Sequence, residues 1–196
     1  EFRLTAEPVK RELAKGMIIN AWGYNGSTPG PTIEAVEGDR VRIFVTNKLP
    51  ERTSVHWHGI FLPNGMDGVA GLNQPHIEKN ETYVYEFTLR QHGTHMYHPH
   101  ADEMVQMAMG MMGFFIIHPE RPERPIDRDF CIFPHMFFIR PGTKTPDPSV
   151  MLDFNLFTFN ARACPGTAPL VVKTGQRVRV RIANLSMDSH PIHLHG

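Results

Sequence analysis

The sequence has little of three things that would narrow its function at once: net charge, long apolar runs and cysteine. Lysine plus arginine and aspartate plus glutamate both number 20, so the net charge is zero with histidine neutral. No basic field is therefore available to hold nucleic acid or an anionic membrane. No apolar run approaches the roughly 20 residues that a transmembrane helix needs. The two cysteines, Cys131 and Cys164, leave open whether they form a disulfide or two free thiols.

Histidine and methionine, by contrast, are abundant. There are 12 histidines and 11 methionines among 196 residues, and both side chains can bind metals. The 16 glycines and 17 prolines lie singly between short apolar runs, which favours an all-β fold with many turns. The length fits one large domain or two domains of about 100 residues.

Histidine recurs in pairs that are separated by one residue. The pairs are His56 and His58, His98 and His100, and His193 and His195, with His190 just upstream of the last. Residues i and i+2 of a β-strand point to the same face, so each pair turns two imidazoles toward one space. One such pair could be two ordinary histidines. Three pairs in one chain indicate a metal site whose ligands are held on strands.

Apolar alternation predicts the strands that carry these pairs. It is clearest over 40–46, where Val41, Ile43 and Val45 share a face. Further strands are expected at 1–22, 54–60, 82–89, 113–118, 154–159, 170–173 and 177–182. Turn residues separate these runs, as in an all-β protein.

The sequence also contains an internal repeat. The stretch 37–47 resembles 174–184, with Gly, Arg, Val, Arg and Asn at matching places. The spacing that superposes Gly38 on Gly175 also superposes the first histidine pair on the third, without a gap. The chain therefore holds two copies of one β unit, each of which ends in a histidine pair.

The second copy is shorter than the first. Counterparts of the second histidine pair would fall beyond residue 196. We therefore expect a complete domain at 1–120, a linker at 121–129 and the first half of a second domain at 130–196. Half a β-sandwich leaves a sheet face and strand edges unpaired. We accordingly expect that this sequence is truncated relative to the native protein, or that the missing half is supplied by another chain.

Together these motifs resemble a known family. The segments HWHG at 56–59, GTHMYHPH at 93–100 and HPIHLHG at 190–196 are similar, in the same order, to three of the four copper motifs of the multicopper oxidases. The resemblance covers most of the chain and implies an all-β, cupredoxin-like Greek-key sandwich. The third motif falls in the second domain. This layout is most similar to that of the two-domain laccases. Those enzymes work as homotrimers with the copper cluster between domains of neighbouring subunits.

The resemblance implies a role for each motif residue. The copper ligands would be His56 and His193 for type 2 copper, His58, His98, His100 and His195 for the type 3 pair, and His190 for type 1 copper. Asp67 would be the acidic residue that relays protons near type 2 copper. The alternative for Asp67 is an ordinary Asp-Gly turn residue.

The implied ligand set is incomplete. The six pair histidines are fewer than the family's trinuclear cluster takes, and a fourth motif, H-C-H, should supply the rest together with the type 1 cysteine. Pro99 and Met104 stand where a type 1 cysteine and histidine of the first domain would stand. We therefore expect any type 1 copper to lie in the second domain, and this segment alone to be inactive.

The implied activity couples one-electron oxidation of a small reducing substrate, phenolic, aromatic or a metal ion, to four-electron reduction of O2 to water. A periplasmic or extracellular location is expected. Three alternatives stay open: a non-catalytic copper-binding module, a copper nitrite reductase-like protein, and a zinc-dependent enzyme. The zinc alternative rests on 98–103, where Glu103 replaces the last histidine of an H-x-H-x-D-H pattern.

The other histidines and the methionines have simpler interpretations. His95 is expected to support the ligands or to line a solvent channel, and ordinary roles are expected for His76, His92, His118 and His135. Methionines cluster at 104, 107, 109, 111 and 112. Thioethers could bind Cu(I) there, but filling of the core by a flexible apolar side chain is the favoured interpretation.

Overall fold

The computed structural model describes residues 1–121, 124–150 and 152–195. Strands dominate it, and the described residues include one short α-helix, α1 (Glu103–Ala108), and one 3-10 turn, η1 (Asn64–Met66). The all-β prediction is confirmed. No helix among the described residues combines the length and apolarity that crossing a membrane requires.

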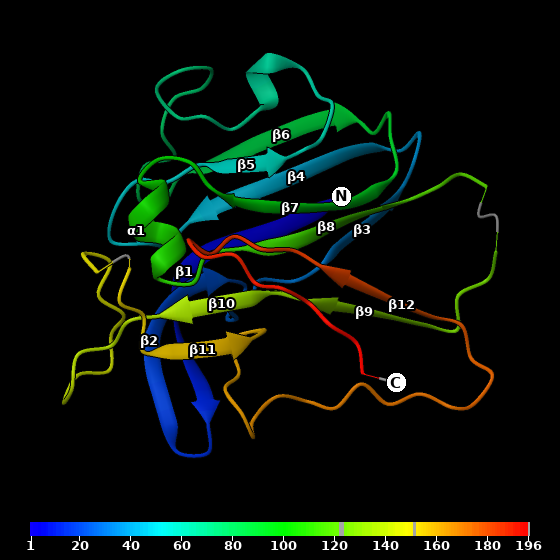
Figure 1. Ribbon diagram of the computed structural model, residues 1–196. Helices are drawn as coiled ribbons and strands as arrows, with labels where there is room; N and C mark the ends of the chain where they lie inside the picture. The colour runs from blue at the N-terminus through cyan, green and yellow to red at the C-terminus, as the bar shows by residue number, and fades with distance from the viewer. Residues whose placement is uncertain (122–123, 151, 196) are drawn as a thin grey trace.

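Two four-stranded sheets form the larger part of the molecule (Figure 1). The first has the order β2-β1-β4-β6 and comprises β2 (Met17–Tyr24), β1 (Phe2–Ala14), β4 (Arg40–Asn47) and β6 (Thr82–Thr88). The second has the order β3-β8-β7-β5 and comprises β3 (Ile33–Val36), β8 (Gly113–His118), β7 (Gly93–Pro99) and β5 (Val55–His58).

Two shorter sheets follow along the chain. In one, β10 (Pro134–Phe137) pairs antiparallel with β11 (Leu156–Phe159). In the other, β9 (Arg128–Ile132) pairs parallel with β12 (Val178–Ile182). The β9–β12 pair repeats the parallel pairing of β1 with β4, as expected if the two regions are copies of one unit. β9 begins inside the stretch predicted as a linker.

The main core lies between the two large sheets. The predicted alternation in β4 is confirmed, because Val41, Ile43 and Val45 are all buried. They belong to one cluster with Trp57 and Phe115 of the second sheet. Each such side chain contributes about 1.5–3 kcal/mol when it is fully removed from water. This core holds β5 and β7 rigidly, and both carry predicted metal ligands.

The N-terminal expectation was wrong in one respect. The stretch 1–22 is a hairpin of two strands, β1 and β2, instead of one entry strand. It turns at Gly16, whose φ of 79° suits glycine. Met17 and Ile18, at the start of β2, are 37% and 44% exposed. Residues 2–6 of β1 pair with β4, and residues 6–14 pair with β2, so the hairpin starts the first sheet.

The second region agrees with prediction only in part. The strands expected at 154–159 and 177–182 form β11 and β12, but 170–173 forms no strand and is exposed. Its β-branched residues favour a strand only where a partner strand and burial are available. Both cysteines are free thiols, Cys131 partly buried and Cys164 exposed.

The second region packs against the outer face of the β3-β8-β7-β5 sheet. Phe114 and Ile116 of β8 form a cluster there with Phe133 and Ala183, and Leu185 packs against it. The β1–β2 hairpin meets the second region as well, because Leu13 and Ile19 cluster with Phe137. The domain boundaries at 1–120, 121–129 and 130–196 stay a prediction.

Candidate metal centre

β5 turns the first histidine pair away from the core. Trp57, between the two histidines, is fully buried in the main core. Alternation therefore puts His56 and His58 on the outer face of the sheet. The Val55 amide donates a hydrogen bond of 3.0 Å to the Tyr85 hydroxyl, which ties the start of β5 to the opposite sheet. A short strand is thus held in one orientation by its neighbours.

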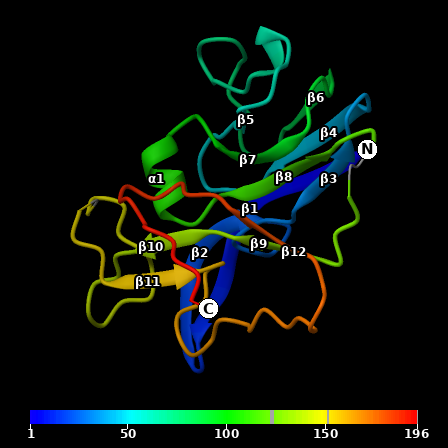
Figure 2. The same cartoon turned by 45° about the vertical axis from the view of Figure 1, so that its right-hand side comes forward.

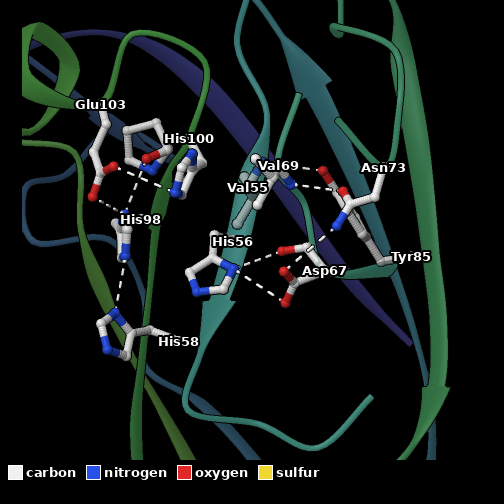
Figure 3. Close-up of polar contacts among 11 residues, drawn as sticks. Val55, His56, His58, Asp67, Val69, Asn73, Tyr85, His98, His100 and Glu103 are labelled. Atoms are coloured by element: carbon white, nitrogen blue, oxygen red, sulfur yellow. Dashed lines mark hydrogen bonds and ion pairs between the residues drawn. The ribbon is translucent and has the colours of Figure 1, made fainter. Parts of the chain in front are cut away.

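β7 brings the second pair to the same face. Antiparallel pairing places His98 directly opposite His56, with their ring centroids 5.3 Å apart. His100 follows the end of β7, and its ring lies 5.5 Å from that of His56. Figure 3 shows the four imidazoles facing one another. Two pairs separated by about 40 residues in sequence therefore meet through one strand register.

Three of these histidines form a group that fits a metal ion. Nitrogen atoms of His56, His58 and His98 lie within 4.8 Å of one another. His58 Nδ1 and His98 Nε2 are 3.2 Å apart. Two metal–nitrogen bonds of about 2.0 Å at a tetrahedral angle separate their nitrogens by about 3.3 Å. Imidazole also suits copper, so spacing and donor type both fit.

Backbone carbonyls orient two of the rings. His56 Nδ1 donates to the carbonyl of Asp67 at 2.7 Å, and His98 Nδ1 lies 3.0 Å from the carbonyl of Pro99. A nitrogen that donates to a carbonyl carries the proton, so Nε2 of each ring keeps its lone pair. Such outer contacts fix the tautomer and orientation of a metal-binding histidine.

The loop after β5 approaches the strand very closely. Gly68 has φ of 87°, and a Cβ at this position would lie 1.8 Å from the Val55 carbonyl oxygen. Only glycine allows this approach, which places the Asp67 carbonyl against His56. The Asp67 carboxylate lies farther, 3.4 Å from His56 Nδ1, and its side chain is 34% exposed. The predicted proton-relay role of Asp67 stays a prediction; its carbonyl makes the shorter contact.

Glu103 is a site residue that the sequence did not single out for this role. It begins α1, and its carboxylate lies 3.6 Å from His98 Nδ1 and 3.4 Å from His100 Nε2 (Figure 3). The i, i+3 spacing from His100 to Glu103 places the two side chains close together where the chain turns into α1. That spacing was visible in the sequence, but the contact with His98 depends on the fold.

Burial keeps the central imidazole neutral. Burial is the main cause that lowers the pKa of His98 to about 4; the Pro99 carbonyl opposes this shift and the nearby histidines add to it. Burial, followed by the proximity of His56, also lowers the pKa of His58. Unprotonated imidazole is the metal-binding form. His58 and His98 therefore present free lone pairs at neutral pH.

The third pair lies outside this group. The rings of His193 and His195 are 4.7 Å apart, but neither joins the clustered histidines among the residues described. Both are exposed and belong to no strand. His190 is half-buried, with Nε2 2.8 Å from Ser186 Oγ. The structure thus brings together His56, His58, His98 and His100, but not the C-terminal three.

His95 lies in the second motif but not in the group. Alternation along β7 puts it with Tyr97, on the face opposite His98. Its Nε2 is buried without a hydrogen-bond partner among the described residues, and burial lowers its pKa. A supporting role for His95 stays a prediction.

A β-sandwich with imidazoles from two paired strands on its outer face defines a cupredoxin-like metalloprotein. Comparison with known families narrows the class. Residues 5–122 match one multicopper oxidase family model and residues 140–196 match another. The chain belongs to the multicopper oxidase family, which confirms both the resemblance and the cupredoxin-like fold.

Individual relatives point the same way. Copper resistance protein A of Escherichia coli is 48% identical over 99 residues, which are 50% of this chain and 16% of that protein. A probable nitrite reductase-hydroxylamine oxidoreductase fusion protein of Kuenenia stuttgartiensis is 29% identical. The match covers 98% of this chain and 24% of that protein.

Among solved structures, a multi-copper oxidase from Pseudomonas thermotolerans superposes with a TM-score of 0.84 at 32% identity. The match covers 95% of this chain and 46% of that one. The chain therefore spans a quarter or less of the two curated relatives and about half of this solved structure.

Proposed function

We propose that this chain is part of a multicopper oxidase that takes single electrons from a small reducing substrate and passes them to O2, forming water. One observation carries the proposal: in a chain of this family, His56, His58 and His98 converge within 4.8 Å on the outer face of the sheet. Ordinary surface histidines have no reason to converge in this way on a rigid strand pair.

The resemblance to the family assigns a copper ion to each of these residues. His56 would bind type 2 copper, and His58, His98 and His100 the type 3 pair. When bound, the copper ions would supply the one-electron exchange with substrate and O2. His193 and His195 would complete this set, and His190 would belong to a type 1 site.

The chain's own residues would prepare the site for the metal. The carbonyls of Asp67 and Pro99 orient His56 and His98 so that each keeps a free Nε2. Glu103 would hold the rings of His98 and His100 in place from the side of α1. The Asp67 carboxylate, partly exposed beside His56, can exchange a proton with solvent and deliver it to the site.

A neighbouring subunit would provide the third histidine pair. His193 and His195 lie apart from the clustered group within one chain, which agrees with a homotrimer whose cluster forms between subunits. We further propose a phenolic, aromatic or metal-ion substrate and a periplasmic or extracellular location, as the family resemblance implies. Nucleic acid is not among the proposed partners, because the chain carries no net charge.

Nitrite reduction is the second candidate. It is favoured by the likeness to the Kuenenia stuttgartiensis fusion protein along 98% of this chain. Pro99, between His98 and His100, argues against nitrite reduction, because a type 1 cysteine of the first domain would be needed at this position.

The test uses the whole protein loaded with copper. We expect copper in excess of one ion per subunit, an intense blue absorption, and O2 uptake with hydroquinone or Cu(I) but no nitric oxide from nitrite. His98→Gln should abolish O2 uptake. His92→Gln should not, because His92 is exposed and contacts Glu37 outside the histidine group. Zinc in place of copper, or nitrite reduction without O2 uptake, would overturn the proposal. Copper binding without turnover would leave only a copper-binding module.

A further inference from the structure

A second group of metal-capable side chains surrounds a small cavity elsewhere in the chain. The cavity has a volume of about 40 Å³ and lies between α1, β10 and the segment after β12. In Figures 1 and 2 these three parts of the chain run side by side. Its sulfur- and nitrogen-bearing lining consists of Met104, Met107, His135, Met136 and Met187. We call this the His135 pocket.

His135 is the unusual member of the pocket. It is 5% exposed, and neither ring nitrogen has a hydrogen-bond partner among the described residues. Its backbone is satisfied, since the Thr158 hydroxyl donates to its carbonyl at 2.8 Å. Buried polar atoms in folded proteins are almost always paired, so a buried imidazole with two free nitrogens indicates a bound water or ion. The cavity is large enough for either.

The methionines around it differ from the others of the same stretch. Met109, Met111 and Met112 are all at most 6% exposed and fill the core, as expected from sequence. Met104 and Met187 are 42% and 53% exposed, although both line the cavity. Methionines that only filled space would be expected inside the core. These two instead stand at the open side of a pocket with a buried imidazole.

The donor atoms around the cavity indicate which kind of ion would bind there. Within the part of the chain that the structure describes, the cavity lining contains thioethers, an imidazole and the Ser186 hydroxyl, but no carboxylate and no thiolate. Thioethers prefer soft ions. Because all donors are neutral and the site is largely apolar, the desolvation penalty also disfavours a divalent ion relative to a monovalent one.

We propose that the His135 pocket binds one soft monovalent metal ion, Cu(I) or Ag(I). His135 supplies the nitrogen donor from β10, and the partly exposed Met104 and Met187 bind from the open side. The pocket shares α1 with the histidine cluster, because Met104 follows Glu103 directly. It does not share a ligand with that cluster, so it can be tested separately.

Ag(I), which mimics Cu(I) but is redox-inert, is the probe. The whole protein is labelled with ¹³C at the methionine methyl groups, and signals are assigned by single Met→Leu changes, which conserve volume. One equivalent of Ag(I) should shift the methyl signals of the pocket methionines. Those of Met111 and Met112, buried outside the pocket, should stay in place. The same shifts are expected in His98→Gln, in which the histidine cluster is damaged.

The nitrogen donor is tested with His135→Phe and with X-ray absorption on the wild type. We expect His135→Phe to weaken Ag(I) binding at least tenfold, and the silver spectrum to require both sulfur and nitrogen neighbours. Unmoved pocket methyls at one equivalent of Ag(I), a nitrogen-only shell, or wild-type affinity in His135→Phe would overturn the proposal. The wild-type measurements decide the matter even if His135→Phe fails to fold.

Discussion

The two copies of the H-x-H strand have the same pattern but different structures. In the first copy, Trp57 between the histidines is fully buried, whereas Leu194 in the second is 91% exposed. The first copy is strand β5, paired with β7. The second belongs to no strand. An H-x-H sequence therefore becomes a pair of aligned ligands only where a partner strand and a core hold the intervening residue.

The strands before the two copies differ in the same way. β4 has neighbours on both sides, β1 and β6, whereas β12 pairs only with β9 among the described residues. The face of β12 that carries Val178, Val180 and Ile182 is correspondingly open, with these residues 39–44% exposed. A missing neighbour on one strand thus leaves the following histidine pair without a sheet to join.

The largest expected effect concerns the residue between each pair. In the 196-residue chain, Trp57→Ala should destabilise the fold by about 3–5 kcal/mol, because it empties part of the main core. Leu194→Ala should change stability by less than about 0.5 kcal/mol, because the side chain is already in water. Urea unfolding of both variants measures the difference. Equal losses would mean that the second copy is as well packed as the first.

The second-largest difference between the two copies is expected in copper affinity. In the same chain, His58→Gln removes a nitrogen from the clustered group and should weaken copper binding by more than about 100-fold, since loss of a mere supporting contact already costs about 10–100-fold. In the monomeric chain, where no neighbouring subunit supplies the third pair, His195→Gln should leave affinity at this cluster unchanged. Competition with a chromophoric chelator measures both. A matching loss in His195→Gln would show that the third pair already joins the cluster within one chain.

A smaller effect is expected at Glu103, which lies beside two histidines of the first copy. Glu103→Gln removes the carboxylate beside His98 and His100 and should lower copper affinity by about 10–100-fold. Asp102→Asn, at the exposed neighbouring position, serves as the control. We would abandon the supporting role of Glu103 if both variants bound copper as tightly as the parent chain.

The unfolding free energy of the metal-free chain should depend on pH in a way that reports the burial of His98. The folded-state pKa of His98 is about 4, against an ordinary value of 6.5. Between these values the unfolded chain binds a proton that the folded chain does not, so stability is present above pH 6.5 and is lost as the pH falls toward 4. In His98→Gln the pH slope of the unfolding free energy should fall by up to about one proton. An unchanged slope would contradict the buried placement.

Much of the fold and part of the site could be predicted from local pattern. The alternation in 40–46 predicts β4 because side-chain direction along a strand depends only on its period. The repeat predicts that β12 copies β4, and the spacing within each pair predicts which histidines can share a face. Three motifs in order were also sufficient to indicate the family.

What the sequence could not determine depends on neighbours that are distant in the chain. The hairpin of 1–22 and the missing strand at 170–173 depend on which partners are available for pairing. The carbonyl of Asp67 reaches His56 only because a loop folds back onto β5. His135 lines one cavity with Met104 and Met107 only because the fold brings β10 beside α1 (Figure 1). The sequence by itself determined which residues can bind a metal. The tertiary structure decided which of them meet, because strand pairing and burial fix direction and distance, and a motif fixes neither.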